Sequence, residues 1–150
     1  ETETAEFKST LRFDLKQGVV NKKLEYVIVK TIAAFMNTEG GTLFIGVDDN
    51  QSITGLDADI QTLPKKNQDG FELHLVEIIT KHIGADLSQH IKISFPEIEG
   101  TAVCMVKVSK SSKPVFTVHE GKEDFFKRVG CSSRPLSREE QSQYEKLRWG

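Results

Sequence analysis

The sequence predicts an α+β fold, in which a mixed, mainly antiparallel sheet with hairpins packs against about three helices. Long segments with helical spacing of apolar residues occur together with short β-favouring runs that turn-forming residues separate. Several of these runs follow one another instead of alternating with helices, which favours α+β over a doubly wound parallel sheet. A chain of 150 residues has the size of one domain, so we expect residues 1–150 to fold as a single unit.

The first helix is predicted from residue 22, because apolar residues then recur at spacings of three and four as far as Phe35. Asn21 is in position to cap its N-terminus. Gly40 and Gly41 end it, since glycine adopts positive φ angles at little cost.

Two more helices are indicated. One begins at Asp69, shows an amphipathic pattern and is closed by Gly84. The other begins after residue 136, where Ser137 and Glu140 have the spacing of a capping box.

Strands are predicted where β-favouring residues form short runs bounded by turn formers. These runs are residues 43–47, 91–95, 102–108, 114–118 and 124–129. Glu99-Gly100 is the expected turn between the second and third runs, and Glu120-Gly121 the turn between the last two. Residues 48–51 form a polar turn after the first run.

Composition limits the functions that are open to the chain. The net charge is -2, so a nucleic-acid site has to be a local basic patch rather than a global positive field. No apolar window is long enough for a membrane span. Cys104 and Cys131 lack zinc-site spacing, which favours a reduced, cytoplasmic protein. The first residue is not Met, so we expect a piece of a longer protein with other domains.

The stretch TEGGTLFIGVDDN, residues 38–50, allows three interpretations: a phosphate cradle, a metal-binding carboxylate pair, or a strand with a turn at each end. Gly41 and Gly46 have P-loop spacing, but Val47 and Asp48 stand where that motif needs Lys followed by Ser or Thr. Asp48 and Asp49 would point to opposite faces of a continuing strand, so only one would join a given site. A polar hairpin turn remains the alternative.

A second acidic group lies at the N-terminus, where Glu1 and Glu6 converge only if the chain bends. Two or three carboxylates around one point suit Mg²⁺ or Mn²⁺, which are hard cations that prefer oxygen ligands. Such an ion activates water or stabilises a phosphoryl transition state. The alternative is a solvated acidic terminus.

Basic and small polar residues are the candidates for contact with nucleic acid, because Lys and Arg neutralise phosphates and Ser hydroxyls donate hydrogen bonds to them. The candidates are Lys8, Arg12, Lys110, Lys113, Lys127, Arg128, Ser132, Ser133 and Arg134. Residues 109–113 are the densest basic loop. Phe44, Phe125 and Phe126 would offer stacking faces, although aromatic residues in strands more often belong to the core.

Four segments together resemble the AlbA_2 domain, the nucleic-acid-binding domain of the Schlafen family and of many bacterial proteins. They are EFKSTLRFDL, IVKTIAAFMNTEGGTLFIGVDD, VCMVKVSKSSKPVF and FFKRVGCSSRPLS, in that order. The resemblance extends over residues 1–149, and the helix-Asn-Thr-Glu-Gly-Gly-strand-Asp-Asp segment is its most specific part.

This resemblance implies a mixed α/β fold, binding of DNA or RNA, and often a C-terminal partner domain. Similar animal Schlafen proteins are endoribonucleases that act on structured RNA through three acids and a divalent ion. Those acids correspond to Glu1, Glu6 and Asp49, with Mg²⁺ or Mn²⁺ as the ion. Their groove is formed by two such lobes, so a homodimer is expected here. Cys131 departs from the family's usual Gly-Asn-Ser-Thr.

Three functional hypotheses follow. The leading one is a cytoplasmic nucleic-acid-binding domain of a larger, regulatory protein, without a membrane span. The second is a divalent-metal-dependent endoribonuclease acting on structured RNA. The third is a protein-interaction or sensory module, which the slightly negative net charge favours.

Overall fold

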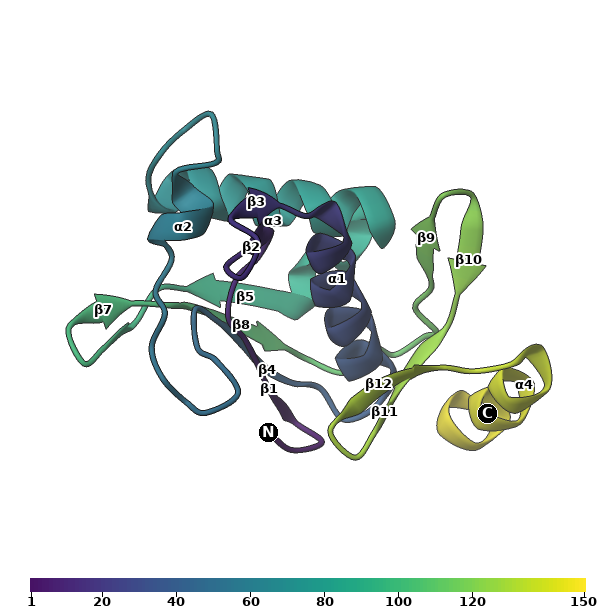
Figure 1. Cartoon of the computed structure of the whole chain (residues 1–150). Helices are drawn as coiled ribbons and strands as arrows, with labels where there is room; N and C mark the ends of the chain where they lie inside the picture. Colours follow the sequence, from purple (N-terminus) through teal and green to yellow (C-terminus); the bar gives the residue numbers. More distant parts are fainter.

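A four-stranded sheet with the order β1-β4-β8-β5 forms the centre of the computed structural model (Figure 1). The structure describes the backbone of residues 1–150 and every side chain except those of Leu87 and Ser88. The four strands are β1 (Ala5–Lys8), β4 (Gly41–Ile45), β8 (Cys104–Val108) and β5 (Ile91–Ser94). β1 runs parallel to β4, whereas β8 is antiparallel to both of its neighbours. The sheet is therefore mixed and mainly antiparallel.

Two long helices lie against one side of this sheet (Figure 1). The helices are α1 (Lys22–Asn37), α2 (Asp57–Ile60), α3 (Gln68–His82) and α4 (Arg138–Trp149), and a 3₁₀ helix, η1, covers Ala85–His90. Ile32 of α1 and Leu75 of α3 are fully buried with Leu43 and Val106 of the sheet. Burying these aliphatic groups is the main force that holds the helices on the sheet.

Four short antiparallel hairpins complete the fold and project from its edges (Figure 1). They are β2 (Phe13–Asp14) with β3 (Val19–Val20), β6 (Glu97–Ile98) with β7 (Thr101–Ala102), β9 (Thr117–His119) with β10 (Lys122–Asp124), and β11 (Phe126–Val129) with β12 (Ser132–Pro135). The predicted α+β class is confirmed.

The predicted helix ends are confirmed in detail. The Asn21 side chain accepts a hydrogen bond from the N–H of Lys23 at 3.0 Å. The Ser137 hydroxyl accepts from the N–H of Glu140 at 3.2 Å, and the Glu140 carboxylate accepts from the N–H of Ser137 at 3.0 Å. Gly84 follows α3 with a φ of 124°.

The glycines after α1 shape the bend into β4. Gly40 has a φ of 76°, and its N–H donates to the carbonyl oxygen of Phe35 at 2.8 Å. A Cβ on Gly41 would lie 2.6 Å from a ring carbon of Phe35, so a larger residue would force the helix away from the strand. Both neighbours of β4 pair with its backbone, and the strand interpretation of this stretch therefore replaces the phosphate cradle.

One predicted strand pair is wrong in part. Residues 117–119 do form a hairpin with 122–124 around Glu120-Gly121, but Phe126–Val129 pairs with β12, which was not predicted. The α2 helix and the β2–β3 hairpin were also missed, because such short elements depend on tertiary contacts more than on local pattern.

The remaining expectations concern single residues. Cys104 is buried and Cys131 is exposed, and both are free thiols. Phe125 and Phe126 are buried, as expected of core aromatics, whereas Phe44 is partly exposed beside Phe7. Within the described residues, no helix has both the length and the apolar character needed to cross a bilayer.

Candidate nucleic-acid interface

The buried side chain of Asn37 joins the C-terminal end of α1 to two later parts of the chain. Its amide nitrogen donates to the carbonyl oxygens of Val115 and Phe126, both at 2.9 Å. Its amide oxygen accepts from the N–H of Val115 at 2.9 Å. The Thr38 hydroxyl accepts from the N–H of Arg128 at 3.0 Å. Buried hydrogen bonds therefore fix the segments that carry the predicted basic residues.

Lys110 and Lys113 lie on the basic loop, residues 109–113, whose centre is anchored. The N–H of buried Ser111 donates to the carbonyl oxygen of Met36 at 2.8 Å. The carbonyl oxygen of Ser111 accepts from the indole N–H of Trp149 at 3.1 Å. Both lysine side chains are exposed beside this anchor. The loop thus presents its charges from a fixed backbone.

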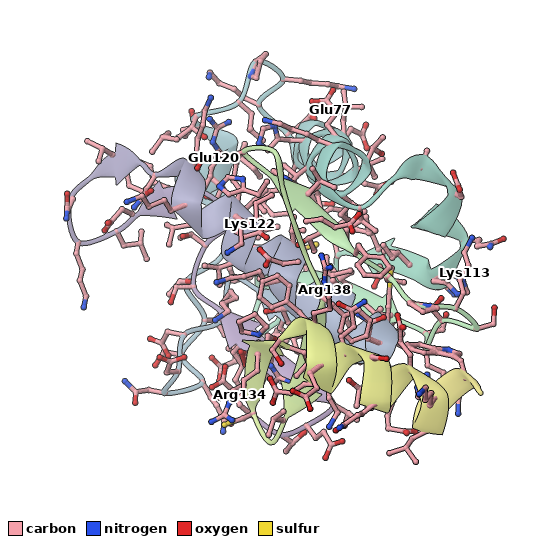
Figure 2. All side chains as sticks on the ribbon, turned by 90° about the vertical axis from the view of Figure 1, so that its right-hand side faces the viewer. Glu77, Lys113, Glu120, Lys122, Arg134 and Arg138 are labelled. Carbon is pink, nitrogen blue, oxygen red and sulfur yellow. The ribbon has the colours of Figure 1, made fainter. Side chains whose placement is uncertain are left out.

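The outer face of the β11–β12 hairpin carries Lys127 and Arg134 directly opposite one another. Arg134 is exposed, and the Lys127 ammonium lies 4.8 Å from the centre of the Tyr144 ring. Like charges in opposite cross-strand positions repel, so this arrangement favours a bound anion between or beside them. Figure 2 shows Arg134 and Lys113 toward opposite edges of the view, with α4 between them.

These four cations keep their charge available. Among the described side chains, Lys110, Lys113, Lys127 and Arg134 have no carboxylate within ion-pair distance. We refer to these four residues as the basic cluster.

The inner face of the same hairpin holds Arg128, whose side chain is buried. Its guanidinium donates to the carbonyl oxygens of Thr2 at 2.8 Å, Glu3 at 3.2 Å and Ala5 at 3.3 Å. It lies 4.9 Å from the centre of the Phe35 ring. All its donors are directed at the protein, so the structure gives Arg128 the role of fastening the N-terminal segment, not the phosphate contact that we expected.

The two serines of the hairpin differ in whether their hydroxyl groups are engaged by the protein. Ser133 faces inward, and its hydroxyl accepts from the Arg128 guanidinium at 3.2 Å. Ser132 is exposed next to Cys131 at the hairpin tip. Only Ser132 keeps a hydroxyl that is free to meet a ligand.

Lys8 and Arg12 lie apart from the basic cluster and are paired with acids. The Lys8 ammonium is 3.5 Å from the Glu6 carboxylate. The Arg12 guanidinium is 3.5 Å from the Glu25 carboxylate, which also lies 2.6 Å from the His74 ring. Because these acids offset their charge, Lys8 and Arg12 are weaker candidates than the basic cluster.

Glu1 and Glu6 are brought together by the turn that precedes β1. The Glu6 carboxyl faces Arg128 at 3.4 Å and donates a hydrogen bond to Glu1. Burial, and then this bond, raise the pKa of Glu6, whereas the bond lowers the pKa of Glu1. The Glu1 carboxylate also accepts from the N–H of Phe7 at 3.1 Å. The two carboxyls therefore interact directly with each other.

The two aspartates after β4 have separate surroundings. The Asp48 carboxylate accepts from the N–H groups of Asn50 at 2.9 Å and Ser52 at 2.8 Å, which closes the predicted turn. Asp49 is exposed at the tip. The base of this hairpin is bonded to β1, since the N–H of Gly46 donates to the carbonyl oxygen of Lys8 at 2.8 Å.

The three predicted metal ligands do not form a site as they stand. Among the described side chains, no group of three or more His, Cys, Asp or Glu residues is arranged to hold a metal ion. Glu1 and Glu6 lie together, and Asp49 does not join them as a third ligand. Two converging carboxyls supply oxygen ligands of the kind that a divalent ion uses, so they form part of such a site.

The structure adds residues that sequence reasoning missed. Asn37 and Thr38 belong to the segment that resembles the family most specifically, but their buried hydrogen bonds to Val115, Phe126 and Arg128 depend on the tertiary structure. Lys92 of β5 and Lys107 of β8 are exposed and directly opposite each other, and they line a 270 Å³ cavity with Ser109 at the start of the basic loop. Alternation along the strands already put both lysines on one face, but only the strand register makes them neighbours.

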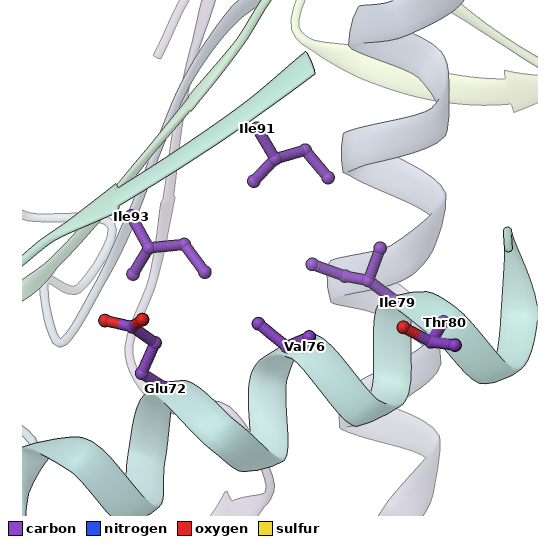
Figure 3. A pocket seen from close by; sticks show the side chains of 6 residues that line it. All are labelled: Glu72, Val76, Ile79, Thr80, Ile91 and Ile93. Atoms are coloured by element: carbon purple, nitrogen blue, oxygen red, sulfur yellow. The ribbon is translucent and has the colours of Figure 1, made fainter. Parts of the chain in front are cut away.

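A different cavity, of about 210 Å³, lies between α3 and β5 (Figure 3). Its walls are mainly aliphatic, with Val76 and Ile79 facing Ile91 and Ile93. Glu72 is the charged group on this wall, so the cavity does not continue the basic surface.

Two solved structures are similar to this chain. The DIP2311 protein from Corynebacterium diphtheriae is 21% identical, with a TM-score of 0.67 over 99% of this chain. The match covers 28% of that protein, so this chain spans about a quarter of its length. The N-terminal domain of a RecG-related protein from Nitrosomonas europaea is 19% identical, with a TM-score of 0.49 over 89% of this chain and 82% of that one. At this identity, the first similarity shows the fold.

The profile of the family described as "Schlafen, AlbA_2" matches residues 1–137, which include β1, the α1–β4 bend and the β11–β12 hairpin. The match confirms the resemblance seen in the sequence, and the chain therefore belongs to the Schlafen AlbA_2 family.

Proposed function

We propose that this chain is the nucleic-acid-binding module of a longer protein and that the basic cluster contacts the phosphates of DNA or RNA. The observation that carries the proposal is that four cations stand on two rigid supports without carboxylate partners among the described side chains. Fixed cations bind phosphate with little loss of side-chain and loop freedom. Membership of an AlbA_2 family supports the same assignment.

Lys92 and Lys107 extend this surface. Lys92 and Lys107 line a cavity with Ser109, the first residue of the basic loop. A strand of nucleic acid bound along the loop would therefore meet further positive charge at this end of it. Contacts of this kind neutralise phosphates and carry no sequence information by themselves. We therefore propose a backbone-reading site in which sequence selectivity, if any, comes from other parts of the parent protein.

Fluorescence anisotropy with labelled hairpin RNA, single-stranded RNA and duplex DNA tests this function. Affinity should fall steeply as salt rises, because Lys and Arg displace counterions from the phosphates. The Lys110→Ala/Lys113→Ala variant should bind roughly tenfold more weakly and show a salt slope smaller by about 2. A Lys16→Ala/Lys65→Ala variant, which removes two lysines outside this surface, is the matched control. Absence of binding to all three probes at low salt would contradict the proposal.

An endoribonuclease is the second candidate, and the convergence of the Glu1 and Glu6 carboxyls favours it. A Mg²⁺ or Mn²⁺ ion would bind between these two carboxyls and would need Asp49 to approach them as a third ligand. Incubation with transfer RNA, with Mn²⁺ or with chelator, tests this candidate. Chelator-sensitive cleavage that Asp49→Asn abolishes would support it, and intact RNA under both conditions would count against it.

The aliphatic cavity of Figure 3 favours a protein-interaction role for a different face. Leu73 and Val76 are 56% and 39% exposed on α3 beside it, which is unusual for large apolar side chains on a solvated helix. A homodimer, or packing of other domains of the parent chain, would cover this face. Sedimentation of the chain at increasing concentration separates a homodimer from a monomer.

A further inference from the structure

A third cavity, of about 730 Å³, opens at the other end of α1, and none of its lining residues was predicted as a site residue. It is bounded by the first turn of α1, the last turn of α3 and the β9–β10 hairpin. Figure 1 shows this hairpin standing beside the C-terminal end of α3. Its lining residues are Lys22, Lys23, Glu25, Lys81, His82, Val118, His119 and Glu120.

The charges that line this cavity are mostly unbalanced positive ones. Lys22, Lys23 and Lys81 have no carboxylate within ion-pair distance among the described side chains. Glu25 is already engaged by Arg12 and His74 outside the cavity. The remaining acid, Glu120, is exposed at the hairpin tip. The carbonyl end of α3 adds some partial negative charge, which three ammonium groups outweigh.

His82 gives the cavity a directional group. Its side chain is buried, with 8% of the residue exposed, and its Nδ1 lies 2.7 Å from the carbonyl oxygen of Val118. Because a carbonyl only accepts, Nδ1 must donate, so the proton of the neutral ring is on Nδ1. Nε2 is then left without a hydrogen-bond partner among the described residues, on a ring that lines the cavity.

Stacked aromatic rings hold His82 in place. Its ring centre is 5.4 Å from that of Tyr26 and 5.3 Å from that of His119, and Tyr26 and His119 stack at 4.2 Å. The Tyr26 hydroxyl is bonded to Thr117 at 2.9 Å. A ring nitrogen without a protein partner, in a cavity that three lysines also line, is an arrangement that an anion with several acceptor oxygens would satisfy.

We propose that this cavity binds a phosphate group, with the three lysines supplying charge and His82 Nε2 supplying a hydrogen bond when the ring is protonated. Phosphate fits because its oxygens accept from several donors at once, whereas a metal cation would be repelled by the lysines. The phosphate would belong to a free ion or mononucleotide, or to the end of a nucleic-acid strand. This site is independent of the proposed function, because it lies at the opposite end of α1 from the basic cluster.

The charged groups around the His82 ring come from each element packed on it. They are Lys22, Lys23, Glu25, Tyr26 and Lys30 on α1, Lys81 on α3, and His119, Glu120, Lys122 and Asp124 on the hairpin. Burial raises the pKa of Tyr26, so this phenol stays neutral near pH 7 and adds no negative charge that would oppose a bound anion.

The test is a titration of the chain with inorganic phosphate and with a nucleoside 5′-monophosphate, followed through the NMR signals of the histidine rings. The His82 signals should shift saturably as the phosphate concentration rises. Lys22→Ala/Lys23→Ala should weaken binding roughly fivefold, since two charge contacts are lost. Lys16→Ala/Lys65→Ala is the control, and its affinity should not change.

His82→Asn sharpens the test, because the Asn amide can still donate to Val118 while Nε2 is removed. This variant should bind phosphate roughly threefold more weakly, because one hydrogen-bond donor to the anion is lost. If the variant does not fold, the affinity of Lys22→Ala/Lys23→Ala tests the proposal instead. An oligonucleotide with a 5′-phosphate and the same oligonucleotide without it distinguish the sources of the phosphate. Tighter binding of the phosphorylated form would assign the site to the ends of nucleic-acid strands. Equal binding of the two forms would assign the site to free phosphate or a mononucleotide. Unshifted His82 signals, or full affinity in Lys22→Ala/Lys23→Ala, would overturn the proposal.

Discussion

The two faces of the β11–β12 hairpin carry cations with opposite surroundings. On the inner face, Arg128 is 2% exposed and donates to carbonyl oxygens of the N-terminal segment. On the outer face, its neighbour Lys127 stands opposite Arg134 without a carboxylate partner among the described side chains. Consecutive basic residues therefore have different tasks, because strand side chains alternate between faces. The inner cation holds the fold, and the outer pair is available to a ligand.

The strongest way to break this comparison is Arg128→Ala. It removes the cation beside Glu6 and the guanidinium hydrogen bonds to three carbonyl oxygens of the N-terminal segment, of which that of Glu3 keeps no other protein donor. Loss of one partner of a buried ion pair costs about 3–5 kcal/mol, so the free energy of unfolding should fall by about that amount in urea denaturation. Arg128→Lys should recover only part of it, because an ammonium cannot reach all these acceptors at once. Unchanged stability would mean that Arg128 is not a structural residue.

Asn37→Ala should have the next largest effect, since it removes three buried hydrogen bonds that hold Val115 and Phe126. We expect a loss of about 3 kcal/mol, because the backbone groups left behind stay buried and unpaired. Thermal unfolding followed by circular dichroism measures it. Nucleic-acid affinity should also fall at temperatures where the variant is still folded, because the supports of the basic cluster loosen. Loss of stability with full affinity would separate the anchor from the interface.

Lys127→Ala/Arg134→Ala tests the outer face. Nucleic-acid affinity should drop roughly tenfold, equal to about 1.4 kcal/mol, and the salt slope should decrease. The free energy of unfolding should change by less than about 0.5 kcal/mol, as for other surface substitutions. Anisotropy titrations and denaturation of the same preparation give both numbers. A large loss of stability with unchanged binding would reverse the roles of the two faces.

The smallest expected effect is the pH dependence that the raised pKa of Glu6 gives to the free energy of unfolding. The pKa of Glu6 is raised, so the folded state holds this proton more firmly than the unfolded chain does. Its contribution to stability is present below the ordinary value of 4.5 and is lost as pH rises through the raised value. Glu1 has a lowered pKa, so its contribution to stability is present and constant above 4.5 and is lost only as pH falls below that value. It therefore does not mask the change at Glu6.

Glu6→Gln cannot titrate and keeps a donor toward Glu1. Its stability relative to the wild type should therefore improve as pH rises from about 5 to 8, the range above ordinary glutamate values. Denaturation curves of both proteins at the two pH values measure the difference. A constant difference would show that Glu6 is already ionised throughout this range.

The sequence by itself determined the local features. The spacing of apolar residues located α1 and α3, Asn21 and Ser137 marked helix starts, and Gly40-Gly41 marked the bend into β4. Short motifs along the chain also indicated the family. These features depend on residues that are neighbours in the chain, so periodicity and capping chemistry are sufficient to find them.

Only the tertiary structure decided which basic and acidic residues are available. Arg128 and Lys127 are both basic and adjacent in the sequence, so the sequence does not distinguish their roles. The pairing of β11 with β12 and its packing on α1 make Arg128 a buried anchor and leave Lys127 as a surface charge. Strand register likewise brought Lys92 to Lys107, and the hairpin fold brought His119 to His82. The physical reason is that burial and charge pairing arise between residues far apart in sequence, whose distances the local pattern does not fix.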